Sequence, residues 1–421
     1  MRRPALFQSD LASYDPRSLP EEPRVSNQPR MAARVSRLTL TDFRNYRSLK
    51  LEAGPGPIVL TGPNGAGKTN LLEALSLLSP GRGLRRARLT EIARQDGPGG
   101  WAVAATIQGP NDETRVGTGL APATGPGGPG GPGGPDGPGR PDRRQVRVDG
   151  RDAPGPAALG RVVALLWLTP RMDRLFLDGA GARRRFVDRL VFGYDADHAR
   201  RVSAYEKAMR ERARLLRAGP ADAAWGAALE TIMAEQGVAV AAARRDWMAR
   251  LNEALGQGIG PFPAARIGLI GTVEDWLAEA PAAAVEDRVR AALAAGRRAD
   301  AEQGRTALGP HRTDLAVHHV ARDRVAARCS TGEQKALLIA LVLADARLTE
   351  LERGQAPILL LDEVAAHLDA AHRAALYDEL IALGCQAWLS GTDPDLFTGL
   401  GGRATFVGVR DAALYPMTGP R

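Results

Sequence analysis

The stretch 62-GPNGAGKTN-70 matches the pattern G-x-x-x-x-G-K-[ST] at every fixed position. The apolar run 58–60 before it predicts a short buried strand, and leucines between residues 71 and 78 follow it at helical spacing. A glycine-rich loop between a strand and a helix is the context in which this pattern cradles phosphate. The sequence therefore predicts a phosphate-binding loop, with a nucleoside triphosphate such as ATP as its ligand.

Each position of this loop has a chemical role. The glycines let backbone N–H groups face inward, and the helix N-terminus adds partial positive charge. Lys68 can reach the terminal phosphates, and the Thr69 hydroxyl can ligate Mg²⁺. The predicted nucleotide-binding residues are Gly62, Pro63, Asn64, Gly65, Ala66, Gly67, Lys68 and Thr69.

A second segment near the other end of the chain, 358-ILLLDEVAAHLD-369, complements the loop. Its apolar residues predict a central strand, which places Asp362 and Glu363 at the carboxyl edge where open α/β sheets bind ligands. We expect Asp362 to hold the Mg²⁺ shell with Thr69. Glu363 is the predicted catalytic residue that orients and deprotonates the attacking water.

A third segment, 329-CSTGEQKALLIALVLADARL-348, predicts a capped helix. Ser330 or Thr331 can cap it, with Glu333 or Gln334 reaching back. The order Ser-x-Gly-x-Gln shortly before the Asp-Glu strand is similar to the signature motif of ABC-type ATPases. In that family the serine contacts the γ-phosphate held by the opposite protomer, so Ser330 is predicted to complete the active site of a second copy.

The number of residues between Lys68 and Ser330 restricts the class of ABC-type ATPase further. It is much larger than in transporter ATPases of this type, and too small for the coiled coil of SMC proteins. No sustained heptad repeat is present either. A compact insertion remains, so we expect an α/β, ABC-type P-loop ATPase head, SMC-like but without a long coiled coil, with an inserted, mostly helical lobe.

The chain closely resembles the RecF family of bacterial recombination mediators. The resemblance covers about residues 34 to 410 and rests on the order and spacing of several segments. These are 38-LTLTDFRNYRSLKLE-52, 79-SPGRGLRRA-87, 168-LTPRMDRLFLDGAGARRRFVDRLV-191, 308-LGPHRTDL-315 and 361-LDEVAAHLD-369, together with the phosphate loop.

The resemblance implies an ATP-dependent homodimer that binds duplex, gapped and single-stranded DNA, with weak, DNA-stimulated ATP hydrolysis acting as a switch. It also implies RecR and RecO as partners, loading of RecA onto single-stranded DNA, and roles in replication-fork recovery and the SOS response. In similar heads a basic residue at the position of Arg44 contacts nucleotide.

The composition agrees with the interpretation of the chain as a DNA-binding protein. The chain has 421 residues, 44% of them hydrophobic, a net charge of +8 and a pI of about 10. This basicity suits a polyanionic partner, although an arginine bias from a GC-rich genome contributes to it. Two cysteines are too few for a disulfide framework, and no apolar run could span a membrane, so we expect a cytoplasmic protein.

The predicted organisation has two lobes. Residues 1–33 form a disordered extension, and residues 34–175 and 305–421 form the ATPase lobe. A flexible Pro/Gly-rich insertion occupies residues 119–142. Residues 176–304 form the helical lobe.

The helical lobe carries the densest positive charge. Arg183, Arg184, Arg185 and Arg189 are predicted to present one compact face to the DNA backbone, because few aromatic residues are interleaved for base stacking. A solvated helix face is the alternative. Arg82, Arg85, Arg86 and Arg88 form a second basic cluster, which could face DNA, a dimer partner or solvent.

One position departs from many ABC-type ATPases, which have a histidine on the strand after the Asp-Glu motif. Here 387-AWLSGTDPDLF-397 offers Ser390 or Thr392, whose hydroxyls cannot carry charge. Weak turnover is consistent with this difference. Three rival functions stay open: a nuclease with an added metal domain, a transporter subunit, and a non-catalytic DNA scaffold. Too few residues follow Asp362 for the first, and the spacing disfavours the second.

Overall fold

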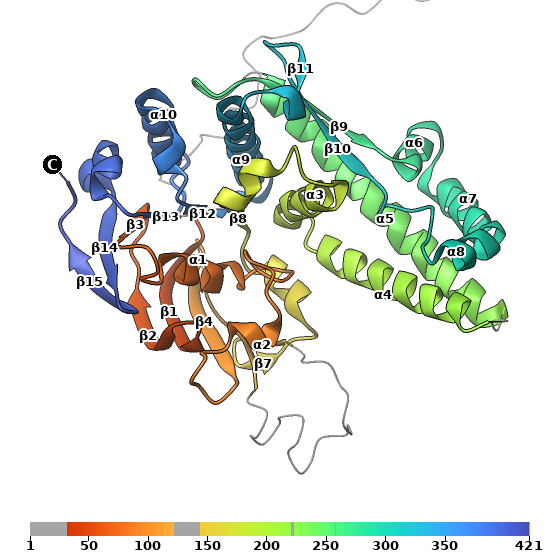
Figure 1. Ribbon diagram of the computed structural model, residues 1–421, viewed down its shortest axis with the longest axis horizontal. Coiled ribbons are helices and arrows are strands. Elements are labelled where there is room, and N and C mark those ends of the chain that lie inside the picture. The colour runs from red at the N-terminus through yellow and green to blue at the C-terminus, as the bar shows by residue number, and fades with distance from the viewer. Residues whose placement is uncertain (1–31, 111, 122–143, 220–222, 257, 421) are drawn as a thin grey trace, which may run out of the picture.

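The computed structural model describes residues 32–110, 112–121, 144–219, 223–256 and 258–420. Two sheets and their helices form one end of the molecule, and long helices extend from it to the other end (Figure 1). The predicted N-terminal extension lies outside the described residues except for Ala32 and Ala33. Most of the predicted Pro/Gly-rich insertion also lies outside them.

A mostly parallel sheet of six strands carries the phosphate loop. Strand β3 is buried along its whole length and pairs on both sides with parallel strands, so it lies inside the sheet. The carboxyl ends of the parallel strands therefore meet at one edge. In spatial order the strands are β15 (Ala413–Met417), β14 (Thr405–Arg410), β3 (Ile58–Thr61), β13 (Ala387–Gly391), β12 (Ile358–Asp362) and β8 (Leu165–Leu168).

An antiparallel sheet packs beside it. Its strands are β2 (Tyr46–Glu52), β1 (Arg34–Phe43), β4 (Trp101–Gln108), β5 (Glu113–Leu120), β6 (Gln145–Val148) and β7 (Arg151–Asp152). One prediction needs correction here. The predicted insertion at 119 begins too early, because Gly119 and Leu120 end β5, where Leu120 packs into the core.

The helices of this end cover the sheets. Helix α9 is buried over most of its length and lies between the parallel sheet and the long helices. The elements are α1 (Lys68–Ser76), α2 (Leu89–Ile92), α9 (Thr331–Arg353), α10 (Ala370–Ala382) and the short 3₁₀ helices η1 (Pro156–Arg161), η2 (Pro170–Arg174), η3 (Ala326–Arg328), η4 (Ala365–His367) and η5 (Pro394–Arg403).

The extended end is mostly helical. It contains α3 (Ala180–Tyr194), α4 (His198–Arg217), α5 (Ala223–Gly256), α6 (Thr272–Glu279), α7 (Ala282–Ala295) and α8 (Arg297–Gln303). A three-stranded sheet of β11 (Arg324–Val325), β10 (Asp314–His319) and β9 (Ala265–Ile270) packs on α5. The predicted lobe boundary at residue 305 separates β9 from β10, which pair along six residues. We propose a boundary after β11 instead.

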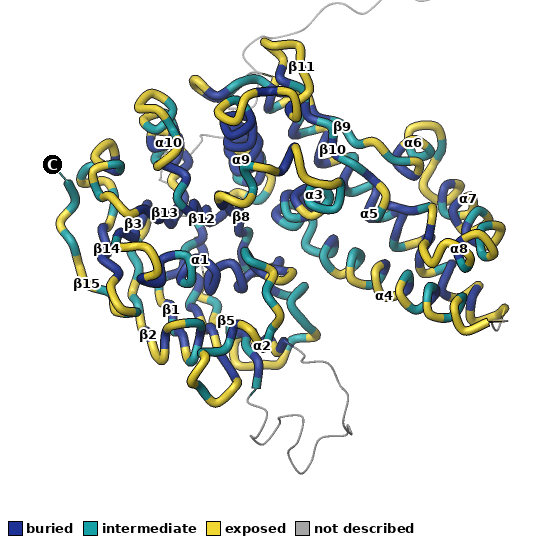
Figure 2. The backbone as a smooth tube through the Cα atoms, in the orientation of Figure 1, coloured by how far each residue is buried: buried dark blue, intermediate teal, exposed yellow. Residues whose placement is uncertain are grey.

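The hydrophobic core is continuous across the two ends. One cluster joins α9 and the parallel sheet to α3, α5 and the β9–β10 pair, and the middle of α9 is buried (Figure 2). A second cluster fills the space between the two large sheets, and a third packs the far ends of α4, α5 and α7. No helix among the described residues combines the length and apolar character needed to cross a bilayer.

Buried arginines fix the helices of the extended end. The Arg212 guanidinium is fully buried and donates to Glu230 at 2.9 Å and to Asp300 at 2.6 Å. Arg244 makes a second buried pair, with two hydrogen bonds to Asp188. The Arg212 bonds join α4 to α5 and α8, and the Arg244 bonds join α5 to α3. At these contacts between helices, ion pairs take the place of apolar side chains.

We predict that Arg212→Ala destabilises the protein by about 3–5 kcal/mol, because it leaves the buried Asp300 carboxylate without its cation and Glu230 with Arg297 alone. The urea midpoint of unfolding, followed by helical circular dichroism, measures the change. Arg214→Ala is the matched control on the same helix, where an exposed pair with Glu211 is worth at most about 1 kcal/mol. Equal shifts for the two variants would contradict this account of Arg212.

Candidate functional site

The phosphate loop follows β3 directly and turns into α1. Gly62, Gly65 and Gly67 have φ values of 153°, 81° and 118°, which disfavour residues with a Cβ. Gly67 also has no room for a side chain, because a Cβ there would lie 2.6 Å from the Tyr46 hydroxyl and 2.7 Å from Asn45 Nδ2. The backbone geometry and the crowding together explain why glycine occupies this position.

Lys68 begins α1 and folds back over the loop. Its Nζ donates to the carbonyl oxygens of Gly62 at 2.7 Å and Pro63 at 2.9 Å, which holds the ammonium at the mouth of the loop. Burial lowers the pKa of Lys68, while the nearby charges of Glu363 and Asp362 act in the opposite direction. The ammonium therefore has limited solvation of its own and lies within reach of an anion in the loop.

Asp362 at the end of β12 and Ser390 on the neighbouring strand β13 meet beside the loop. The Thr69 hydroxyl donates to Asp362 Oδ1 at 3.0 Å, and the Ser390 hydroxyl donates to the same oxygen at 2.7 Å. The backbone N–H of Glu363 donates to the Ser390 oxygen at 3.0 Å. The sequence left Ser390 and Thr392 as alternatives at the strand after the Asp-Glu motif. The structure brings Ser390 into this cluster, whereas Thr392 is exposed.

Glu363 is half-buried at the end of β12 with a φ of 53°, in the left-handed region. Such a conformation costs a non-glycine residue of order 1 kcal/mol or more, and it recurs at functional sites. The hydrogen bond from its N–H to Ser390 helps to hold this turn. Glu363 is thus positioned beside Asp362 by the backbone rather than by its own side-chain contacts.

The β1–β2 turn supports the loop through residues that the sequence reasoning missed. Asn45 Nδ2 donates to the Ala66 carbonyl at 3.2 Å, and the Tyr46 hydroxyl donates to the Gly67 carbonyl at 3.1 Å. Asn45 Oδ1 also accepts from Asn70 Nδ2 at 2.7 Å. Their position next to Arg44, in the segment Phe43–Tyr46, is the sequence feature that could have identified them.

Arg44 itself contacts helix α1. Its Nε and Nη2 donate to the two carboxylate oxygens of Glu73 at 2.8 and 2.7 Å, and its Nη1 donates to the Glu91 carbonyl at 2.7 Å. Arg85 completes the cluster with bonds to Glu73 and Asn70. Every nitrogen of Arg44 is therefore occupied in the structure, and its contact with nucleotide stays a prediction.

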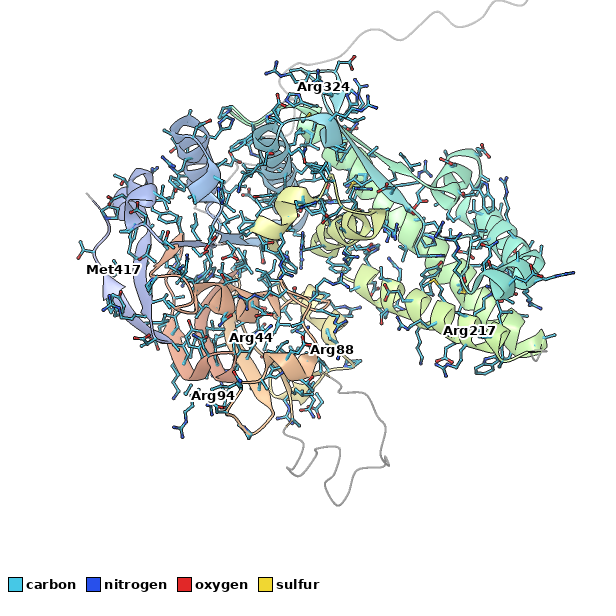
Figure 3. The ribbon with its side chains drawn as sticks, in the orientation of Figure 1. Arg44, Arg88, Arg94, Arg217, Arg324 and Met417 are labelled. Atoms are coloured by element: carbon cyan, nitrogen blue, oxygen red, sulfur yellow. The ribbon has the colours of Figure 1, made fainter. Side chains whose placement is uncertain are left out.

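Ser330 lies at the start of α9, as its N-cap residue. Its hydroxyl accepts from the Glu333 N–H at 3.3 Å, and its own N–H donates to Glu333 Oε2 at 2.8 Å, which is a complete capping box. Ser330 is exposed, and no hydrogen bond among the described residues joins it to the phosphate loop. Arg324, close to Ser330 in sequence, and Arg44, beside the loop, lie far apart in Figure 3.

The four predicted DNA-binding arginines do not form one face. Arg183 makes two hydrogen bonds to Asp314, and Arg184 donates to the Thr313 carbonyl at 2.7 Å, so both face β10. Arg189 lies over the Trp167 ring, and Arg185 alone is exposed. Adjacent residues of a helix point about 100° apart, which explains the split. DNA contact by these residues stays a prediction.

His311 takes no part in the phosphate site. Its Nδ1 lies 2.6 Å from the Tyr205 hydroxyl and its Nε2 3.0 Å from the Thr306 carbonyl, and burial lowers its pKa. It links the segment before β10 to α4.

The donor set beside the loop suits Mg²⁺. This ion prefers oxygen ligands and is often held by one or two protein groups together with substrate phosphates. The Thr69 hydroxyl and the Asp362 carboxylate, 3.0 Å apart, match that requirement. No group of three or more His, Cys, Asp or Glu side chains that could hold a metal occurs in the described part of the chain.

Comparison with known sequences places the chain among DNA repair proteins. A family model described as an AAA domain matches residues 37–96. The DNA replication and repair protein RecF of Mesorhizobium japonicum is 49% identical over 385 residues, which cover 91% of this chain and 97% of the relative. The protein of the same description from Caulobacter vibrioides is 50% identical over 397 residues, covering 91% and 98%.

Solved structures confirm the predicted fold class. The recombination mediator protein RecF of the RecFOR pathway, solved with ATP, superposes with a TM-score of 0.76 at 19% identity and covers 93% of this chain and 100% of its own. The Smc head domain of Pyrococcus furiosus, bound to a domain of ScpA, gives 0.50 at 14% identity, covering 92% and 96%. The molecule has an α/β, ABC-type ATPase head similar to those of SMC proteins.

We predict that Gly67→Ala lowers affinity for ATP by roughly tenfold or more, because the new Cβ displaces Tyr46 and Asn45 from the loop and strains its backbone. Isothermal titration calorimetry with ATP measures the loss. Gly402→Ala is the control, since a Cβ there meets no atom within 4 Å and the backbone φ is ordinary. Wild-type affinity in Gly67→Ala would contradict the proposed packing of the loop.

Proposed function

The chain belongs to the RecF family of DNA replication and repair proteins, and from this premise we propose that it is an ATP-dependent DNA-binding protein of recombinational repair. The observation that supports the proposal most strongly is a divided active site. The phosphate loop, Asp362 and Glu363 lie together, while Ser330 is exposed and makes no hydrogen bond to them among the described residues.

We propose that ATP binds with its phosphates in loop 62–69. The backbone N–H groups and Lys68 would bind the phosphates, and Thr69 and Asp362 would hold Mg²⁺. The solved RecF with ATP supports this assignment. When bound, the cation neutralises charge on the β- and γ-phosphates.

We propose that Glu363 is the general base. Its backbone turn places the carboxylate beside Asp362, where it would orient the attacking water and accept a proton from it. Ser390 holds both acids in register through its two hydrogen bonds. Because its hydroxyl is neutral, it adds no charge to stabilise the transition state, which is consistent with slow turnover.

The remaining part of the site would come from a second copy. Ser330 and the exposed N-terminus of α9 offer a hydroxyl and partial positive charge suited to a γ-phosphate. We propose that two protomers enclose two ATP molecules, each bound by the loop of one copy and the Ser330 of the other. Hydrolysis would then release the dimer.

We propose that the ATP-bound dimer holds duplex DNA beside single-stranded gaps, and that DNA stimulates hydrolysis. Net charge of +8 supports binding to a polyanion. By family membership we also propose that the protein is cytoplasmic and that RecR and RecO are its partners. We further propose that it helps to load RecA and acts in the SOS response and in replication-fork recovery. Strand-exchange assays with RecA on gapped DNA, with and without this protein, test the loading role.

We predict that ATP drives the wild-type protein into dimers, whereas Ser330→Arg and Ser330→Asp stay monomeric. Aspartate keeps the helix cap but places negative charge against the γ-phosphate, so its failure cannot be ascribed to loss of the cap. Sedimentation velocity with ATP, ADP or no nucleotide, with and without gapped DNA, measures the outcome.

Two further variants make the dimerisation test specific. Ser330→Thr keeps the hydroxyl and should dimerise, and Ser48→Arg adds the same charge to exposed strand β2 and should behave as wild type. Ser330→Arg and Ser330→Asp should still bind ATP with an affinity within about threefold of wild type, since their phosphate loop is intact. ATP-dependent dimers of Ser330→Asp at wild-type affinity would rule out the shared site.

We predict that Ser390→Ala lowers kcat for ATP hydrolysis roughly tenfold with little change in KM, because two hydrogen bonds of about 1 kcal/mol each no longer hold Asp362 and Glu363. Glu363→Gln should lower kcat by roughly 100-fold or more and prolong the dimer. Phosphate-release assays with and without DNA measure both.

Thr392→Ala is the control for the turnover experiment, since this exposed hydroxyl lies two residues from Ser390. It should keep wild-type turnover. If Glu363→Gln left turnover and dimer lifetime unchanged, the non-catalytic scaffold would be the better description.

A further inference from the structure

A large cavity lies between the sheet end of the molecule and the first two long helices. Its volume is about 1110 Å³, and its walls are residues 80–86, 154–161 and 167–175 and the facing sides of α3 and α4. We call it the interlobe cavity. In Figure 1 these elements face one another across the centre of the molecule. No residue of the phosphate loop, 62–69, lines it, so it is separate from the ATP site.

The cavity is lined by cations that lack carboxylate partners. Among the described residues, no carboxylate lies within ion-pair distance of six of the basic side chains that line it. These are Arg82, Arg86, Arg171, Arg185, Arg189 and Lys207. Two acids on the same walls already have partners: Asp188 pairs with Arg244 outside the cavity, and Asp197 pairs with Arg161 and Arg200, two further cations of the lining. The cavity therefore has an excess of positive charge that the protein itself does not neutralise.

Arg189 is the most informative of these residues. Its guanidinium carbon lies 4.3 Å from the Trp167 ring centre and 5.5 Å from that of Phe186. Its Nε is buried without a hydrogen-bond partner, and among the described residues its guanidinium has one hydrogen-bond contact, Met172 Sδ at 3.5 Å from Nη2. Burial lowers its pKa to about 9, although the charge of nearby Asp345 acts in the opposite direction. A poorly solvated cation that no carboxylate holds in an ion pair is costly, so this position is suited to an anionic ligand.

The other arginines reinforce the positive field. Arg86 is close enough to Arg185 and Arg82 for their charges to lower its pKa, after the larger effect of burial, and only Glu206 opposes them. The two basic clusters that the sequence keeps far apart, one after α1 and one in α3, thus face the same cavity. Repulsion among them would be relieved by a bound phosphate.

The shape and walls of the cavity restrict the ligand. Trp167, Phe186 and Phe192 line the cavity next to the arginines, and Phe192 is the most exposed of the three. Cations beside aromatic rings suit a nucleotide with its phosphate and its base. A double helix is too wide to enter a cavity of this volume. Inorganic phosphate would leave the aromatic wall without a partner.

We propose that the interlobe cavity binds a nucleotide unit, with its phosphate on Arg185 and Arg189 and its base against the aromatic wall. The unit belongs either to a single nucleic-acid strand or to a free nucleotide. The inference rests on the proposed function only in taking nucleic acid as a natural source of that unit. It adds a second nucleotide-binding site to the chain, distinct from the ATP site.

The experiment measures, by fluorescence anisotropy, the binding of a fluorescein-labelled oligothymidylate 12 nucleotides long. The salt concentration is fixed, and the phosphate loop is saturated with ADP. Fixed salt matters because phosphate binding depends strongly on ionic strength. Arg185→Glu and Lys207→Glu should each weaken binding roughly tenfold or more. Arg217→Glu makes the same charge change at the exposed far end of α4 (Figure 3) and should change affinity less than about twofold.

Competition identifies the source of the unit. If thymidine monophosphate displaces the oligonucleotide at micromolar concentration, the ligand is a free nucleotide. If only unlabelled oligothymidylate does so, the ligand is a strand. Equal losses for Arg185→Glu, Lys207→Glu and Arg217→Glu, or no binding of either probe to wild type, would overturn the proposal.

Two readouts separate this proposal from the proposed function. Quenching of tryptophan fluorescence by the bound probe should disappear in Trp167→Phe, which simple attraction to surface charge would not explain. ATP-driven dimerisation should be unchanged in Arg185→Glu, whose side chain is exposed and forms no ion pair with the described residues. A wild-type protein that fails to dimerise but binds the probe in the cavity would refute the shared ATP site alone.

Discussion

The hydrogen bonds that converge on Asp362 Oδ1 are the constraint on which the site depends. They connect Thr69 at the start of α1 and Ser390 on β13 to the end of β12, so three segments distant in sequence are fixed within about 3 Å of one oxygen. This is possible because β3, β13 and β12 are parallel neighbours, and their carboxyl ends meet at one edge. A shift of one residue in the register of any of these strands would move its polar group to the other face of the sheet.

The same geometry is consistent with the proposal that one copy presents only part of a site. The sheet edge gathers the loop and both acids, whereas Ser330 at the start of α9 makes no hydrogen bond to them among the described residues and is already fixed by its capping box. The helix N-terminus is thus organised before any partner arrives, and little further ordering would be needed on binding. In the proposed dimer, an incomplete site with a rigid complementary part would make ATP occupancy and dimerisation depend on each other, which is the property that a nucleotide-controlled DNA clamp needs.

The sequence predicted the parts of the fold and site that depend on local spacing. The loop, the buried strands β3 and β12, and the capped helix α9 follow from glycine positions, apolar runs and a capping pattern within a few residues. Asn45 and Tyr46 were missed because their contacts with the loop require the β1–β2 pair to pack beside α1, which no local pattern shows. The single face predicted for Arg183 to Arg189 was wrong because helix rotation directs Arg183 and Arg184 toward β10. The lobe boundary failed for a similar reason, since β9 and β10 pair across it.

Arginine content alone does not explain where arginines lie in this molecule. Arginines at exposed positions cost little, but guanidinium groups held away from water need a physical reason. Arg212 is stabilised there by two carboxylates, and Arg44 by the carboxylate of Glu73. The Arg189 Nε is buried without a hydrogen-bond partner, and its guanidinium contacts aromatic rings and a sulfur atom, with Asp345 acting on it only through its charge. A cation–π contact of about 2 kcal/mol is smaller than the several kcal/mol that desolvation of a cation costs. The fold therefore retains an unfavourable residue in the wall of the interlobe cavity, and an anion bound in that cavity is the simplest physical reason for its presence.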